Sequence, residues 1–252
     1  MGTWVHVIDV FVIIHSILVY GKKWTGIFFV LACSLGLLSE HVGAAYGWVF
    51  GKFHYQPDRI MFFGTVPVLT PVSWWLILYC AYNTTNLVFG DMKDSRTWGV
   101  WLRAAAIVLM ASLDGLMAMN LDMLFDPVMV SPRRARWVWE HGGAYFNIPI
   151  QNFLGWFLVA FSVSLLIRTF DAVRGRAVPL GERLLHYFPS GLYFCMFAFF
   201  GFLGYVDGYP HYTLIGFSGM IPFVLWAALR GVVMYARAAP GTPLSRRGKL
   251  LR

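Results

Sequence analysis

Seven long apolar stretches, separated by charged residues, glycines or prolines, run through this chain of 252 residues. A bilayer core about 30 Å thick is crossed by about 20 helical residues, so each stretch can form one transmembrane helix. We therefore predict an all-α, polytopic membrane bundle of about seven transmembrane helices, in a single domain over residues 1–252. The stretches are Trp4–Tyr20, Trp24–Glu40, Thr70–Phe89, Trp98–Phe125, Ile148–Phe170, Leu184–Tyr205 and Tyr212–Tyr235.

The low share of charged residues excludes a soluble domain. Only 13% of the residues are charged and 58% are hydrophobic, whereas globular proteins carry roughly 25% charged residues. The formal charge of +8 comes from Lys and Arg between the apolar stretches and in the tail, so it indicates membrane topology and not nucleic-acid binding. No Cys or His spacing typical of a metal site occurs, so no metal is expected.

The basic residues also predict the orientation. With seven spans, most of the 20 Lys and Arg residues fall on one side of the membrane, Arg168 among them. By the positive-inside rule that side is cytoplasmic. We expect the N-terminus outside, the C-terminus inside, and a basic cytoplasmic tail over about residues 237–252. The basic residues on the outer side are Lys52, Arg59, Arg133, Arg134 and Arg136.

Four acidic residues stand inside or at the ends of spans, where a charge costs about 2.5–3.5 kcal/mol. Asp114, Asp122 and Asp126 lie within about one third of the circumference of one helix. Glu40 ends another helix that runs in the same direction, so these acids can converge near the outer face. Two carboxyl groups close together in a poor dielectric cannot both ionise at low cost, so one is expected to hold a proton and act as a general acid.

A less specific interpretation of two of these acids is also open. Asp122 and Asp126 can sit at the membrane interface as helix caps or as ion-pair partners of the arginines that follow them. Asp126-Pro127 is expected to end the fourth helix, because proline lacks the N–H that a helix interior needs.

Aromatic and amide side chains gather in the segment from Trp137 to Trp156. Aromatic faces stabilise a cation by about 0.5–2 kcal/mol, although Trp and Tyr also collect at membrane interfaces with no chemical role. Asn152, just inside a span, needs partners and can orient a water or a carboxylate. The glycine-rich segment before it along the chain ends in His54 and Tyr55, an imidazole and a phenol.

Four blocks of residues occur in order between Glu40 and Trp156. They are Glu40–Gly43 with Gly47–Tyr55, then Gly64–Pro67, then Leu121–Pro127, and last Trp139–Gly143 with Tyr145, Ile148-Pro149 and Asn152–Trp156. In these blocks the chain resembles the membrane-embedded carotenoid biosynthesis protein family, whose best-known members are the CruF-type carotenoid hydratases of bacteria and archaea. It departs from the expected pattern at Val49, Phe53 and Asn120, in place of proline, tyrosine and a more apolar residue.

The resemblance implies a cofactor-independent enzyme of a prokaryotic plasma membrane. Such an enzyme adds water across the terminal double bond of a long isoprenoid or carotenoid and leaves a tertiary alcohol. Its partners would be this apolar substrate and membrane lipid.

Protonation of an unactivated alkene needs a strong positioned acid, exclusion of bulk water and stabilisation of the resulting cation. We expect Asp122 or Asp126 to deliver the proton, with Asp114 or Glu40 tuning its acidity and the other aspartate activating water. The remaining candidates are Asn152 and Tyr145, which would position that water, and Trp139, Trp156, Tyr55 and His54, which would contact the substrate.

Three other functions are open from the sequence. If an internal double bond captures the cation in place of water, the protein is a proton-initiated terpene or polyene cyclase. Acids and helix breakers at membrane depth also suit a transporter or a proton-conducting protein. A structural anchor is the simplest alternative, against which the acid Asp114 deep in a span argues.

Overall fold

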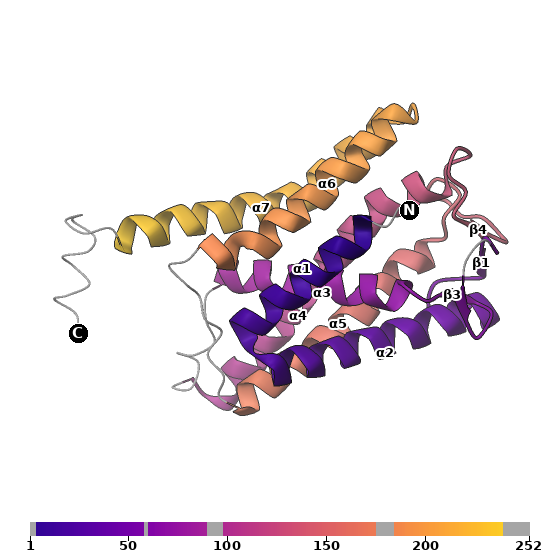
Figure 1. The fold of residues 1–252 in the computed structure, drawn as a ribbon. Coiled ribbons are helices and arrows are strands. Elements are labelled where there is room, and N and C mark those ends of the chain that lie inside the picture. Colours follow the sequence, from indigo (N-terminus) through magenta and orange to yellow (C-terminus); the bar gives the residue numbers. More distant parts are fainter. Residues whose placement is uncertain (1–3, 58–59, 90–97, 175–183, 239–252) are drawn as a thin grey trace.

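The computed structural model describes residues 4–57, 60–89, 98–174 and 184–238. The described residues form seven α-helices that pack side by side (Figure 1), which confirms the predicted all-α class. The helices are α1 (Trp4–Tyr20), α2 (Lys22–Tyr46), α3 (Thr70–Phe89), α4 (Val100–Val130), α5 (Ile150–Arg174), α6 (Phe188–Val206) and α7 (Pro210–Ala238), and a 3₁₀ turn, η2 (Leu184–Tyr187), precedes α6. The predicted tail at 237–252 lies almost wholly outside the described residues.

Five of the helices are long and apolar enough to cross a membrane: α2, α4, α5, α6 and residues Pro210–Val233 of α7. The protein is therefore an integral membrane protein. In α1 the apolar part is shorter, Ile8–Tyr20. Helix α3 is the centre of the bundle, because every side chain from Trp74 to Val88 is buried and α3 packs against α2, α4, α6 and α7.

The fourth helix does not end at Asp126-Pro127, as the sequence predicted. Helix α4 continues through Pro127 to Val130. A proline inside a helix leaves the carbonyl four residues earlier without its N–H partner, and here that carbonyl belongs to Met123. The hydroxyl of Tyr145 donates a hydrogen bond to it at 2.8 Å, so a side chain from another segment replaces the missing backbone donor.

Helix α2 is longer than its apolar stretch and runs past Glu40 to Tyr46. Gly47 ends it in the left-handed conformation, with φ at 75°, and its N–H bonds to the carbonyl of Gly43. Glycine adopts this conformation without strain. Glu40 therefore lies within the helix, with its side chain turned into the bundle, and does not cap its end.

Four short strands lie together at one end of the bundle, far from the last turns of α7 (Figure 1). Strands β1 (Phe53–Tyr55) and β4 (Trp137–Trp139) pair antiparallel, with Phe53 opposite Trp139. Strands β2 (Met61–Phe62) and β3 (Val66–Pro67) form a hairpin. Side chains alternate along a strand, so β1 buries Phe53 and turns His54 outward.

Candidate active site

A cavity of about 380 Å³ lies at the end of the bundle that carries the strands. Its walls are mainly apolar and aromatic, and a few polar groups reach into it. Side chains from α1 to α5, from β1, β3 and β4 and from the segments between them line it. The polar lining residues are Asp9, Glu40, Tyr55, Thr70, Ser73, Asp126, Arg136 and Asn152.

Two aspartates of α4 share one amide of α5 beside this cavity. Asp122 and Asp126 are one helical turn apart, with 0% and 3% of their surface exposed. The Asn152 side-chain nitrogen donates to an oxygen of each carboxyl group, at 2.6 Å and 2.7 Å. The two carboxyl groups are close enough to interact with each other, and two buried carboxyl groups this close cannot both ionise at low cost. We call Asp122 and Asp126 the acid pair, and Asn152 its amide.

Asp126 is the member of the pair that faces the cavity. The Trp137 side chain lies close to its carboxyl group. Asp122 is completely buried and is not part of the lining. Asp126 can therefore contact a molecule bound in the cavity, and Asp122 behind it can hold a proton or exchange it with Asp126.

Glu40 approaches the same cavity from α2 with both carboxyl oxygens occupied. The Trp74 indole nitrogen donates to Oε1 and the Tyr55 hydroxyl donates to Oε2, each at 2.9 Å. Burial raises the pKa of Tyr55 well above its ordinary value, and the nearby charge of Glu40 raises it further. Tyr55 therefore stays neutral and donates, and this environment suits a carboxylate that accepts hydrogen bonds.

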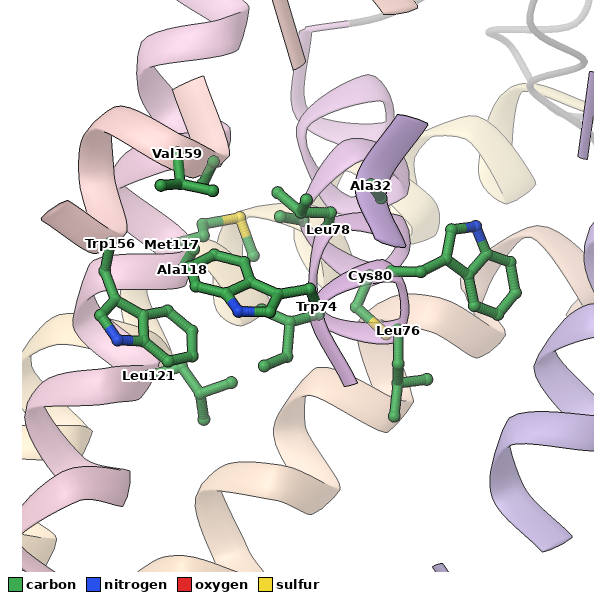
Figure 2. Close-up of a cluster of buried hydrophobic side chains, with 14 of the residues drawn as sticks. Ala32, Trp74, Leu76, Leu78, Cys80, Met117, Ala118, Leu121, Trp156 and Val159 are labelled. Atoms are coloured by element: carbon green, nitrogen blue, oxygen red, sulfur yellow. The ribbon is translucent and has the colours of Figure 1, made fainter. Parts of the chain in front are cut away.

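Aromatic rings form the floor and one wall of the cavity. Trp74 and Trp156 stack with ring centroids 4.2 Å apart, as Figure 2 shows beside Leu121. On the wall, the rings of Phe53 and Trp139 lie 4.9 Å apart. Such faces carry negative charge density and attract a cation, so this surface can stabilise positive charge on a bound hydrocarbon.

The structure does not bring Asp114 to this site. It lies two turns below Asp122 on α4, where Arg168 and Ser164 of α5 bind its carboxylate at 2.7–3.0 Å. Figure 2 shows a cluster of buried apolar side chains, which we call the apolar belt. Its members on α4, Met117, Ala118 and Leu121, lie between Asp114 and Asp122 along the helix. The belt consists of Ala32, Trp74, Leu78, Met117, Ala118, Leu121, Trp156 and Val159.

Two predicted site residues have other surroundings than expected. His54 points away from the cavity, because successive side chains of strand β1 point to opposite faces. Its side chain is 58% exposed and lies 3.9 Å from Glu140. Tyr145 lies close to the acid pair, but its hydroxyl is committed to the Met123 carbonyl. Burial raises the pKa of Tyr145, and the Asp122 charge adds to this. It therefore acts on α4 as a neutral donor.

Two of the arginines after α4 bind an acid at the end of α6, not the acids of α4. Arg134 binds Asp207 at 2.7 Å, and Arg133 lies 4.0 Å from the same carboxylate. Arg136 lines the cavity. Arg168, which the sequence assigned to a basic membrane side, is 95% buried and is the partner of Asp114.

Sequence reasoning missed two residues of the site, Trp74 and Asp9. Trp74 was one aromatic among many in an apolar span, and nothing in its spacing marks it as the donor to Glu40. Trp137 was among the aromatic residues considered, and the structure places it in the cavity lining close to Asp126. Asp9 lines the cavity from α1 and is 8% exposed. The sequence did indicate it, because a single acidic residue in an apolar helix is a candidate functional residue.

The arrangement combines two adjacent buried carboxyl groups, a third carboxyl group with two hydrogen-bond donors, and aromatic faces around an apolar cavity. It can donate a proton to an apolar molecule and stabilise the cation that results. Among the described residues, no group of three or more His, Cys, Asp and Glu side chains is placed to hold a metal ion.

Comparison with known proteins gives one match. A family model described as "carotenoid biosynthesis protein" matches residues 1–222. The match includes all the residues of the cavity and of the acid pair. Searches of curated proteins and of solved structures found no match.

Proposed function

This chain belongs to the carotenoid biosynthesis protein family, and from that premise we propose that it is a membrane hydratase of CruF type, which adds water to the terminal double bond of a carotenoid or related isoprenoid. Family membership supports a role in carotenoid biosynthesis. The observation that carries the specific chemistry is the acid pair, bridged by Asn152, at an aromatic cavity.

In the proposed first step, Asp126 transfers its proton to the less substituted carbon of the alkene. The π bond breaks, a C–H bond forms and a tertiary cation remains. Asp122 supports this step because it shares its proton with Asp126, and Asn152 holds the two carboxyl groups together. General acid catalysis by a positioned group contributes about 10²–10⁴-fold to a rate.

In the second step, a water oxygen bonds to the cation and forms the tertiary alcohol. The water loses a proton to a carboxylate of the site, so the net change is the addition of one water. Glu40 is suited to this base role, because Trp74 and Tyr55 hold both of its oxygens as acceptors. The stacked rings of Trp74 and Trp156 would stabilise the cation until water attacks.

The size of the cavity supports a site for the end of a long chain. Ligand sites usually measure about 300–1,000 Å³, and this one, at about 380 Å³, would hold only part of a carotenoid. Ile60, Val68 and Leu69 flank the β2–β3 hairpin and line the cavity, and Ile60 and Leu69 are exposed apolar side chains. We place the access route for the substrate here, directly from the bilayer.

The proposed orientation sets the acid pair near the outer leaflet, with the N-terminus outside and the C-terminus in the cytoplasm. The apolar belt favours an enzyme over a proton-conducting protein, because hydrophobic side chains separate the two buried acidic levels. A proton path would need polar groups or water across that distance.

The test is expression of the full chain in a host that accumulates lycopene. We expect new pigments whose mass exceeds that of the substrate by one or two waters. Asp126→Asn and Asp122→Asn should abolish them while the protein remains in the membrane. Glu140→Gln, which changes an exposed acid near the same strands, is the matched control and should retain activity.

The product mass also separates hydration from cyclisation, since ring closure adds no mass. A ring-closed product of unchanged mass would replace the hydratase proposal with a cyclase that uses the same acid pair. Full activity in both aspartate variants would exclude the acid pair as the proton donor.

A further inference from the structure

The second buried polar cluster is built around one ion pair. Arg168 of α5 donates to Asp114 of α4 from Nε at 2.8 Å and from Nη2 at 3.0 Å. Ser164, one turn earlier on α5, donates to the same carboxylate at 2.7 Å. Asp114 is completely buried and Arg168 nearly so. The proposed chemistry uses none of these three side chains.

Arg168 also fixes the central helix. Its Nη1 donates to the side-chain oxygen of Asn86 at 2.8 Å, and its Nη2 donates to the backbone carbonyl of Tyr82 at 3.3 Å. The guanidinium lies over the Tyr82 ring, 4.4 Å from its centroid. One side chain thus joins α3, α4 and α5. Of these helices, α3 carries Trp74, α4 carries the acid pair and α5 carries its amide.

The Ser164 contact of the ion pair and the Asn152 contact of the acid pair sit at the same register of two antiparallel helices. Asp114 meets Ser164, and Asp126 meets Asn152. The two contacts are therefore separated by the same number of residues on both helices, from 114 to 126 on α4 and from 164 to 152 on α5. This corresponds to about 18 Å along each helix. A slide of α5 by one residue would move Asn152 by about 1.5 Å and break both contacts.

Close packing between the two levels transmits this register. A side-chain carbon at Gly115 of α4 would lie 2.9 Å from the Phe157 ring of α5 and 3.0 Å from the Phe157 carbonyl. The backbones of α4 and α5 can approach this closely only because residue 115 is a glycine. Closely packed interiors transmit a displacement and do not absorb it.

We infer that Arg168 and Asp114 are a positioning pair, which fixes the register of α4 against α5 and so holds Asn152 between Asp122 and Asp126. This inference rests on the proposed role of the acid pair. Buried ion pairs add little net stability compared with apolar packing, and their best-attested use is to specify register. A planar guanidinium that binds a carboxylate through two nitrogens sets such a register more narrowly than a lysine can.

The test compares Arg168→Lys and Ser164→Ala with the control Ser162→Ala in the purified full chain. Ser162 is an exposed serine on the same helix, whereas Ser164 is buried against Asp114. Two properties are measured: the pH dependence of kcat, and the infrared C=O stretch of the protonated carboxyl group, which is assigned by its change in Asp122→Asn and Asp126→Asn.

We expect Arg168→Lys to shift the infrared band and the pH profile and to lower kcat by about 100-fold, the order of loss that a 1 Å misplacement causes, with KM little changed. Ser164→Ala should shift the band in the same direction by less, and Ser162→Ala should leave band and profile as in the wild type. Should Arg168→Lys fail to fold, Ser164→Ala carries the test, because it removes a single hydrogen bond.

A wild-type band and pH profile in both Ser164→Ala and a folded Arg168→Lys would overturn the positioning role, even if the melting temperature fell. The infrared measurement needs no substrate. An absence of hydratase activity in the wild type would therefore count against the proposed function alone, and the band would still decide the positioning role.

Discussion

The hydroxyl of Tyr145 occupies the hydrogen-bonding position that Pro127 leaves open on α4. The carbonyl of Met123 would accept from the N–H of residue 127 in an unbroken helix, and it accepts from Tyr145 at 2.8 Å. The helix can therefore keep a proline next to Asp126 without an unsatisfied carbonyl. The loop before α5 is thereby fixed to the helix that carries the acid pair.

This relationship predicts a specific coupling between the two residues. Tyr145→Phe should destabilise the protein by about 1 kcal/mol, because the half-buried Met123 carbonyl loses its donor. In a Pro127→Ala background the same change should cost little, because the alanine supplies a backbone N–H to the Met123 carbonyl. Thermal melting of the four proteins in detergent gives the double-mutant cycle. Equal costs of Tyr145→Phe in both backgrounds would contradict the explanation.

Trp74 and Trp75 offer a matched pair for the role of the Glu40 contact. Both indoles are buried, but only Trp74 donates to Glu40. The Trp75 indole N–H has no hydrogen-bond partner in the part of the chain that the structure describes. Hydrogen bonds to charged groups contribute about 1.5–3 kcal/mol, so Trp74→Phe should lower kcat by about 10- to 100-fold.

Trp75→Phe is the control and should change kcat by less than Trp74→Phe. Both variants delete part of a buried indole, so melting temperatures in detergent show whether packing alone explains a loss. Equal kcat values for the two variants would remove the Trp74 N–H from the mechanism.

Gly155 predicts how tightly the glycine-rich loop is held against α5. A side-chain carbon there would lie 2.5 Å from the Val49 carbonyl oxygen and 2.6 Å from the Phe50 ring. Gly155→Ala should therefore displace this loop, which carries a cavity wall, and lower both the melting temperature and the activity. Gly26→Ala meets no atom within 4 Å and should stabilise α2 by up to about 1 kcal/mol. A neutral Gly155→Ala would show that the loop is not packed as described.

The raised pKa values of Tyr55 and Tyr145 predict alkaline sensitivity. Both groups stay neutral in the folded protein above pH 10, where the unfolded chain begins to ionise its tyrosines. Their contribution to stability is therefore complete below about pH 10 and is lost as the pH rises further. The melting temperature should fall less between about pH 9 and pH 11 in Tyr55→Phe than in the wild type. An identical fall in both proteins would contradict the raised pKa of Tyr55.

The number of helices followed from the apolar stretches, because each hydrocarbon crossing demands its own run of residues. Helix ends were less predictable. Pro127 was expected to terminate α4, and the donor that allows the helix to continue comes from Tyr145, which is distant in sequence. A local pattern contains no information about such a replacement.

The convergence of Glu40 with Asp122 and Asp126 followed from helix direction alone, whereas the place of Asp114 did not. Asp114 lies on a similar face of α4 to the other two acids, so the sequence alone does not distinguish it. Only the packing of α5 shows that Arg168 is its partner. In the same way, a strand of three residues decides that Tyr55 faces Glu40 and His54 faces outward, and one step of register would exchange them.

The apolar belt has a consequence for a cell that stores energy as a proton gradient. Ionisable groups placed on both halves of a bilayer would let hydrogen ions leak if a wet passage joined them. In the proposed orientation, the packed side chains of Met117, Ala118 and Leu121 between the two levels of α4 would oppose proton transfer from one leaflet to the other. The proposed general acid could then work inside an energised membrane without discharging it.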